Sequence, residues 1–158
     1  MTAEATGPLA RPLEMSGLEH LEAIGDGRFP APPIGELIGF ELVEVGHGRA
    51  TFAVLPGEQH YNPIGVVHGG IAATLLDSAM GCAVQTTLDA GVGYTTLDLN
   101  VTFLRPMTSE TGKVLCEAAV LHTGSRVATA EGRVFSARTG KLLATGTCSC
   151  VIFQPEES

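Results

Sequence analysis

The pattern of apolar and polar positions predicts one buried helix and a set of strands. Residues 69–84 are almost wholly apolar and free of proline, which predicts an enclosed helix that runs to about Leu88. Apolar and polar side chains then alternate over residues 96–103, which predicts a strand with one solvent-facing side that ends at residues 105–106. The apolar set of this alternation is Leu97, Leu99, Val101 and Phe103.

Two strands are expected before this helix, and three after the alternating strand. They are predicted at residues 40–45, 50–55, 114–122, 126–136 and 142–153. The turns between the last strands are short, which favours antiparallel pairing, and only one long helix is available to cover the inner face of the sheet. The sequence therefore predicts an α+β fold over residues 36–158, with an antiparallel sheet wrapped around one long central helix.

Residues 1–35 are rich in glycine, proline and acidic side chains and are interpreted as an appended N-terminal arm. One short helix is indicated within it, because Ser16 and Glu19 have the spacing of a capping box before three apolar residues, and Gly25 ends the pattern. This arm is either a mobile tail or a flap that covers an apolar pocket.

Composition and charge exclude several classes of function. The chain has 158 residues and a formal net charge of −8, without a cluster of basic residues, which argues against binding to nucleic acid or to an anionic membrane. No apolar run approaches the roughly 20 residues that span a bilayer, and the first residues lack the pattern of a signal peptide, so we expect a cytoplasmic protein. The four cysteines lack the spacing of metal ligands and are expected to be buried reduced thiols, without a metal site.

Asp77 is the most informative residue, because it is the one carboxylate within the apolar helix. It lies about two turns from the start of the helix, beyond the reach of the helix dipole. If it were buried without a partner, its charged form would be destabilised by several kcal/mol. Thr74, Ser78 and Gln85 fall on the same narrow stripe, which marks where solvent, a ligand or a second subunit meets the helix. Asp77 is therefore either a hydrogen-bonded structural carboxylate or a catalytic one.

Gly69 and Gly70 open the helix, where unpaired N–H groups form a ready site for an anion or an oxyanion. The alternative is that they only allow close packing against the sheet. Along the helix axis, Gly69 and Asp77 are separated by about 12 Å, which is too far for both to act on one reacting atom. Two antiparallel helices related by a two-fold axis would bring Gly69 of one subunit to Asp77 of the other, so an enzyme of this design has to be at least a dimer.

These residues belong to a longer motif with a family resemblance. The motif is Asn62-Pro63-x-Gly65-x-x-His68-Gly69-Gly70-x-x-x-x-Leu75-x-Asp77, followed by Thr96-Leu97-Asp98-Leu99-Asn100 and Phe103-Leu104-Arg105-Pro106. It resembles the hotdog-fold acyl-CoA thioesterases of the phenylacetate-pathway (PaaI-like) type, within the 4-hydroxybenzoyl-CoA thioesterase superfamily. The resemblance covers residues 39–153 and implies a hotdog fold over the predicted α+β domain.

The resemblance also implies roles for individual residues. The Gly69 N–H, helped by Asn62, would bind the thioester carbonyl, and Asp77 of the partner subunit would attack that carbonyl or activate a water. Thr96 matches the position where relatives have a serine or threonine that orients this water. In this family His68 mainly shapes the loop beside the substrate, next to Gly70.

Further expectations concern the ligand and the assembly. Arg105 and Arg126 are the candidates for contacts to the coenzyme A phosphates, although each equally suits a surface ion pair. The expected activity is cofactor-free hydrolysis of an aromatic or medium-chain acyl-CoA by a homodimer or homotetramer. Two alternatives remain: a non-catalytic acyl-CoA-binding module, and a hotdog enoyl-thioester hydratase.

Overall fold

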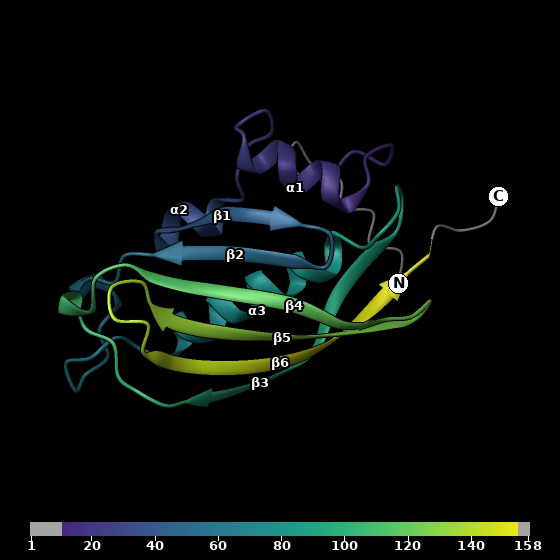
Figure 1. The fold of residues 1–158 in the computed structure, drawn as a ribbon. Coiled ribbons are helices and arrows are strands. Elements are labelled where there is room, and N and C mark those ends of the chain that lie inside the picture. Colours follow the sequence, from purple (N-terminus) through teal and green to yellow (C-terminus); the bar gives the residue numbers. More distant parts are fainter. Residues whose placement is uncertain (1–10, 155–158) are drawn as a thin grey trace.

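The computed structural model describes residues 11–154, which form a curved sheet with one long helix in its concave side (Figure 1). The helices are α1 (Gly17–Gly25), α2 (Pro33–Ile38) and α3 (Gly69–Gln85), with single 3-10 turns at Glu58–His60 and Ser109–Thr111. The strands are β1 (Phe40–Gly46), β2 (Arg49–Val54), β3 (Gly93–Phe103), β4 (Val114–Thr123), β5 (Val127–Ser136) and β6 (Leu142–Phe153). The predicted order of one long helix and six strands is thereby confirmed.

The six strands form one sheet in the order β1-β2-β4-β5-β6-β3, and every neighbouring pair is antiparallel. β3 follows α3 in the sequence but pairs with the last strand, so it becomes an edge of the sheet. The other edge is β1. The predicted antiparallel sheet around a central helix is confirmed, and the curvature brings both edges to the side of the helix that the sheet leaves open.

The core lies between α3 and the concave face of the sheet. Leu75, Leu76 and Met80 of α3 are fully buried there. Close approach depends on two glycines, because a Cβ atom on Gly132 of β5 or Gly146 of β6 would come within 2.9 or 3.1 Å of the Leu76 side chain. A helix that is apolar around most of its circumference is thus enclosed on the sheet side, as its sequence predicts. No helix in residues 11–154 is long and apolar enough to cross a membrane.

The first helix forms as its sequence predicts. The Ser16 hydroxyl accepts a hydrogen bond from the Glu19 N–H, and the Glu19 carboxylate accepts one from the Ser16 N–H, which completes the capping box. α1 packs on β1 and on the end of α3 (Figure 1). The described part of the arm therefore lies against the domain.

The second helix, α2, is absent from the sequence-based prediction. Its six residues are too few to show a helical period, and its boundaries come from backbone chemistry. Pro33 opens it with a preset φ angle, and Gly39 closes it in the left-handed conformation, at a φ of 83°. This short helix leads the chain into Phe40, which is buried.

The prediction for the alternating strand is wrong in part. Leu97 and Phe103 belong to its apolar set, yet their side chains are 64% and 59% exposed. A β-bulge between Thr96 and Asp98 leaves Leu97 without a partner on β6, so the strict alternation of faces is broken. The exposure of Phe103 follows from the edge position of β3, which has a neighbouring strand on one side only.

Candidate active site

Asp77 lies on the open side of α3, and its side chain is exposed. In a single chain Asp77 is therefore not a buried carboxylate, and the polar stripe of α3 faces outward as its residues predict. The reason is geometric: the sheet covers the face of α3 that carries Leu75, Leu76 and Met80, and Asp77 points away from that face. Its charge is thus compatible with folding of the chain, and its position is open to a ligand or a second subunit.

One hydroxyl group meets this carboxylate. The Thr96 Oγ1 donates a hydrogen bond of 2.8 Å to Asp77 Oδ1, and the two residues come from β3 and α3 respectively. The β-bulge in β3 begins directly after Thr96, and bulges commonly re-aim a side chain next to a functional site. The structure therefore brings together two of the residues predicted for catalysis, and no hydrogen bond within residues 11–154 engages Asp77 Oδ2.

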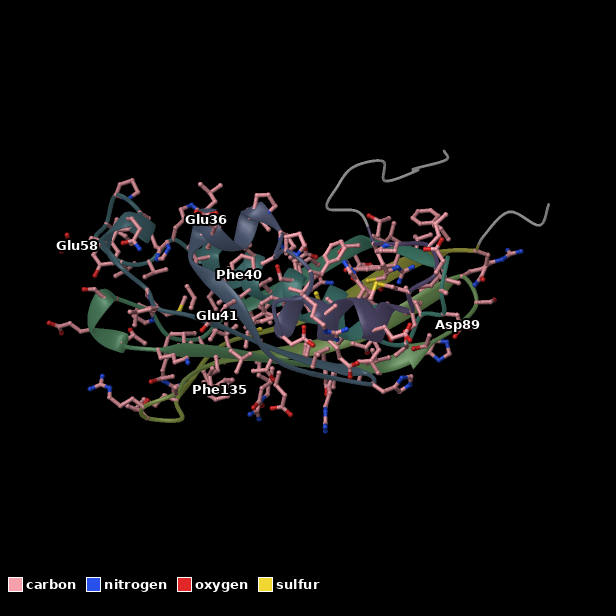
Figure 2. All side chains as sticks on the ribbon, turned by 90° about the horizontal axis from the view of Figure 1, so that it is seen from above. Glu36, Phe40, Glu41, Glu58, Asp89 and Phe135 are labelled. Atoms are coloured by element: carbon pink, nitrogen blue, oxygen red, sulfur yellow. The ribbon has the colours of Figure 1, made fainter. Side chains whose placement is uncertain are left out.

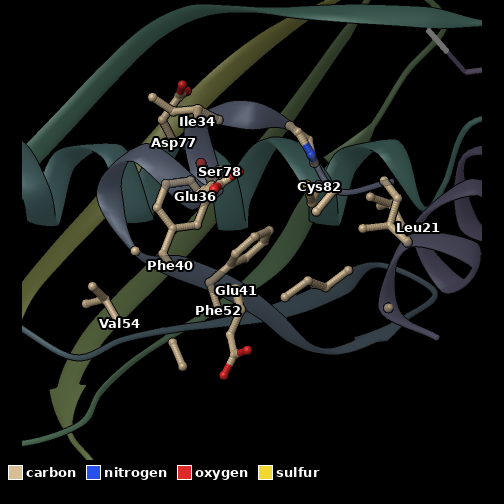
Figure 3. A pocket seen from close by; sticks show the side chains of 18 of the residues that line it. Leu21, Ile34, Glu36, Phe40, Glu41, Phe52, Val54, Asp77, Ser78 and Cys82 are labelled. Atoms are coloured by element: carbon tan, nitrogen blue, oxygen red, sulfur yellow. The ribbon is translucent and has the colours of Figure 1, made fainter. Parts of the chain in front are cut away.

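A cavity of about 1110 Å³ opens beside this pair (Figure 3). Its walls come from both edges of the sheet, from α1 and α2, and from the open side of α3. In Figure 3, Asp77, Ser78 and Cys82 project from α3, while Phe40 and Phe52 face them from β1 and β2. The two phenylalanine rings pack edge to face at a centroid distance of 5.7 Å. Such an apolar cavity beside a hydrogen-bonded carboxylate suits a small-molecule substrate.

The charged residues around this cavity are mostly acidic. Besides Asp77, the lining contains Glu36 and Glu41, and among the described residues Lys113 is the only cation that lines it. Negative groups on a ligand are therefore disfavoured inside the cavity. An uncharged part of the ligand therefore fits the cavity, and any phosphates of the ligand would have to lie outside it.

Two other reactive groups in the lining stay protonated. Burial raises the pKa of Cys82 to about 12, and the nearby charge of Asp77 adds to this effect. Burial likewise raises the pKa of Tyr94 well above its usual value, with smaller contributions from the neighbouring thiols and Asp77. At neutral pH Cys82 is a thiol and not a thiolate, so it is a poor nucleophile. The lining carboxylates therefore remain as candidate catalytic groups, and among them Asp77 accepts the hydrogen bond from Thr96.

The N-terminus of α3 is shaped by its cap. The His68 Nδ1 accepts a hydrogen bond of 2.8 Å from the Gly70 N–H, and the His68 carbonyl accepts one from the Ile71 N–H. Within residues 11–154, no contact engages the Gly69 N–H, which makes it the donor available to an oxyanion. Close packing also matters at this position, because a Cβ atom on Gly69 would come within 3.0 Å of the Phe103 ring. Close packing therefore applies at Gly69, while oxyanion binding by its N–H stays a prediction.

Asn62 organises the loop before the helix. Its Oδ1 accepts hydrogen bonds from the Ile64 and Val66 N–H groups, and its backbone N–H donates to the Val66 carbonyl. The side chain is therefore fixed through its oxygen, and its amide nitrogen remains as a donor. A role for Asn62 beside the Gly69 N–H stays a prediction.

The two arginines lie far apart in one chain. Arg105 follows the end of β3 and lines a small hollow with Gly69 and Phe103, where its guanidinium donates to the Leu142 carbonyl. Arg126 lies in the turn before β5, and its carbonyl accepts from the Ile152 N–H near the start of β3. The 11 residues of β3 separate the two positions, so one chain does not bring them to one ligand.

The same distance divides the predicted catalytic groups. The loop that carries Glu58 and the turn that carries Asp89 lie at opposite ends of the molecule, so α3 runs lengthwise between them (Figure 2). Asn62, His68 and Gly69 lie at the N-terminal end of α3, whereas Asp77 lies about 12 Å further along its axis. One chain therefore holds the two halves of the predicted site apart.

Several cavity residues were missed by reasoning from the sequence. Tyr94, Phe40, Phe52 and Lys113 line the cavity, and each comes from a strand or its immediate start. Aromatic and lysine residues in strands are ordinary, so no local signal distinguishes them. The sequence contains one usable hint, the apolar residues of the short helix α1, which also reach this cavity.

Comparison with known proteins places these features in a family. The family model of the thioesterase superfamily matches residues 64–143, which include the N-terminus of α3, Asp77 and Thr96. Human acyl-coenzyme A thioesterase 13 is 32% identical over 106 residues, which cover 66% of this chain and 74% of the relative. A Halobacterium salinarum protein assigned as an esterase is 46% identical over 78 residues, which cover 48% of this chain and 46% of that protein. The match thus spans about half the length of that relative.

A solved structure shows the same fold. A Ralstonia eutropha protein described as related to phenylacetic acid degradation superposes with a TM-score of 0.73 at 29% identity, over 82% of this chain and 97% of that one. The predicted hotdog architecture is thereby confirmed. With its six-stranded antiparallel sheet around α3 and its match to the family model, the chain belongs to the thioesterase superfamily and is similar to the PaaI-like thioesterases.

Proposed function

We propose that this protein hydrolyses the thioester bond of an acyl-CoA whose acyl group is aromatic or of medium length. The observation that carries the proposal is the Asp77 carboxylate, held by the Thr96 hydroxyl at 2.8 Å and open to a cavity of about 1110 Å³. Family membership and the named activity of acyl-coenzyme A thioesterase 13 support the choice of substrate.

The proposed chemistry uses two groups, the Asp77 carboxylate and the Gly69 N–H. A water molecule gives a proton to Asp77 and adds to the thioester carbonyl, whose oxygen becomes an oxyanion that the Gly69 N–H binds. The C–S bond then breaks, the coenzyme thiolate takes up a proton, and the free acid leaves. Direct attack by Asp77 gives the same products through an anhydride. A single turnover in ¹⁸O-labelled water would place label in Asp77 only by the direct route.

The site requires two chains, because Gly69 and Asp77 lie about 12 Å apart along α3. We infer a homodimer in which β3 of each subunit lies along β3 of the other. β3 is an edge strand with Leu97 and Phe103 exposed, and such an apolar edge favours association. Antiparallel helices across the two-fold axis would then bring Gly69 of one subunit to Asp77 of the other.

The same arrangement gives the two arginines a common purpose. Arg105 follows the end of β3 and Arg126 lies near its start, so antiparallel β3 strands would place Arg105 of one subunit on the side of Arg126 of the other. The cavity itself is acidic, and the phosphates of coenzyme A need cations at its mouth. We propose Arg105 and Arg126 as those cations, with His68 and Gly70 shaping the entrance through their hydrogen bond.

The direct test is release of free thiol from a panel of aromatic and aliphatic acyl-CoAs. We expect turnover by the wild type and a loss of about 100- to 10,000-fold in Asp77→Asn, because the base or nucleophile is removed. Asp89→Asn is the matched control, since Asp89 is an exposed aspartate just beyond α3 and outside the cavity lining.

Each outcome points to one class of function. Equal turnover by wild type and Asp77→Asn would refute the catalytic assignment. Tight binding of acyl-CoA without thiol release would identify a binding module, and loss of the enoyl absorbance without thiol release would identify a hydratase. Sedimentation of the wild type as a stable monomer that still turns over would refute the shared site.

A further inference from the structure

α1 forms one end wall of the cavity beside Asp77. Leu21 and Ile24 of this helix line the same cavity as the Asp77 carboxylate, and Leu21 is only 3% exposed. Figure 3 shows Leu21 entering from α1 on the side of Cys82. The N-terminal arm therefore contributes to the surface that a bound acyl group would meet.

The wall is fixed in position by polar contacts with the end of α3. The Gly17 N–H donates a hydrogen bond of 2.9 Å to the Leu88 carbonyl, and the Gln85 side-chain amide donates one of 3.0 Å to His20 Nδ1. The packing is tight at Gly17, where a Cβ atom would come within 1.7 Å of the Gln85 carbonyl oxygen. These contacts hold α1 in one position against α3, so α1 is a fixed wall of the cavity.

The distance from the carboxylate to this wall sets a reach. Cys82 lines the cavity about 7 Å beyond Asp77 along the axis of α3, and Gln85, which holds α1, lies about 12 Å beyond it. An acyl group whose carbonyl lies at Asp77 would therefore meet α1 after roughly one to two helical turns. This span suits a single aromatic ring or a chain of medium length.

The surface at this end is apolar. Leu42 and Phe52 join Leu21 and Ile24 in the lining, and burial raises the pKa of the Cys82 thiol to about 12, so that it stays uncharged. The far end of the acyl group would meet aliphatic and aromatic side chains there. Water and charged groups would be disfavoured.

We propose that α1 is the specificity element of this enzyme, and that Leu21 and Ile24 set the length of the acyl group it accepts. This inference rests on the proposed thioesterase function. Shortening either side chain opens the end of the cavity to longer acyl groups, and enlarging Ile24 closes it. In hydrophobic pockets, one methylene group changes relative rates by about 10- to 200-fold.

The test is a series of saturated acyl-CoAs of increasing chain length, measured as kcat/KM for the wild type, Leu21→Ala, Ile24→Ala and Ile24→Phe. We expect the optimum to move to longer chains in both alanine variants, with the ratio of long-chain to medium-chain kcat/KM raised about tenfold or more. In Ile24→Phe it should move to shorter chains. Glu22→Ala is the control, because Glu22 lies on the exposed side of α1, and its optimum should stay unchanged.

Binding provides a second measurement that does not depend on turnover. Dissociation constants for the same acyl-CoAs are measured by calorimetry on Asp77→Asn and on Asp77→Asn combined with each α1 variant. A shift in the preferred chain length supports the wall, even if hydrolysis is absent and the proposed function fails. Normal hydrolysis with an unchanged ranking in all three α1 variants would overturn this inference alone. Opposite shifts in Ile24→Ala and Ile24→Phe exclude the explanation that α1 has simply come loose.

Discussion

Two regions of the open side of α3 have similar polar character and different surroundings. At Asp77, the carboxylate meets the Thr96 hydroxyl and faces a cavity. At Gln85, about two turns later, α1 covers the helix and His20 accepts the amide hydrogen bond. The polar group that another element covers holds the fold together. The polar group that remains open is available for chemistry.

The hydrogen-bond partners of Asp77 and Gln85 also differ in their surroundings. Thr96 is half-buried on an edge strand, and its hydroxyl leaves one carboxylate oxygen of Asp77 free. His20 is 7% exposed, lies edge-on to the Phe29 ring, and has its Nε2 buried without a hydrogen-bond partner among the described residues. The buried contact between Gln85 and His20 is therefore structural, and the unpaired Nε2 of His20 makes its burial energetically costly. Substitutions in the two regions should therefore change different properties.

The largest effect is expected from Asp77→Ala. Turnover should fall by about 100- to 10,000-fold, because the proposed base or nucleophile is lost. The free energy of unfolding should change by no more than about 0.5 kcal/mol, since the side chain is exposed in the chain and its removal leaves no cavity. Urea denaturation beside a thiol-release assay checks both. A large loss of stability would show that Asp77 is a structural contact like Gln85, and that the two regions do not differ in this respect.

Gly17→Ala should have the next largest effect, and on stability. Its Cβ atom would come within 1.7 Å of the Gln85 carbonyl oxygen, so α1 or the end of α3 has to move. We expect a loss of about 1 to 3 kcal/mol in the free energy of unfolding, measured by denaturant titration. Gly25→Ala is the matched control at the other end of α1, because its Cβ atom would lie 3.9 Å from Leu42, an ordinary contact. Equal stability of the two variants would show that α1 is not held at Gly17.

Thr96→Val tests the partner in the open region. It keeps the shape of the side chain and removes the hydroxyl that donates to Asp77. Loss of one hydrogen bond, worth about 1 kcal/mol, should lower kcat/KM about fivefold with little change in stability. Thr95→Val, next to it on β3, has an exposed side chain outside the cavity lining and serves as the control. A kcat/KM equal to that of the control would remove Thr96 from the site.

The smallest effect concerns pH in the covered region. Burial lowers the pKa of His20, and the charge of Arg11 lowers it further. The unfolded chain therefore binds a proton at His20 more readily than the folded chain does, so stability is full above about pH 6.5 and falls as the pH drops below it. Denaturation at pH 8 and pH 5.5 should show a larger decrease for the wild type than for His20→Asn. Parallel decreases in the two proteins would contradict a neutral buried His20.

The elements themselves are largely determined by the sequence. The apolar run of residues 69–84 requires an enclosed helix, the alternating stretches require strands, and the spacing of Ser16 and Glu19 produces the cap of α1. These features depend on local backbone and side-chain chemistry, which is why a sequence reveals them. The motif from Asn62 to Asp77 likewise indicates the family from the sequence alone.

The polar stripe of α3 predicts which side of the helix stays open, but only the tertiary structure decided what surrounds that side. The burial of a helical side chain depends on which face the sheet covers, and that depends on pairings between strands far apart in the sequence, such as β3 with β6. For that reason Leu97 is exposed, at a bulge that the alternation of residues does not predict. The contact of Thr96 with Asp77 and the packing of α1 at Gln85 also depend on elements that are far apart in the sequence. The sequence determined which groups are present, and the long-range packing decided which of them face the cavity.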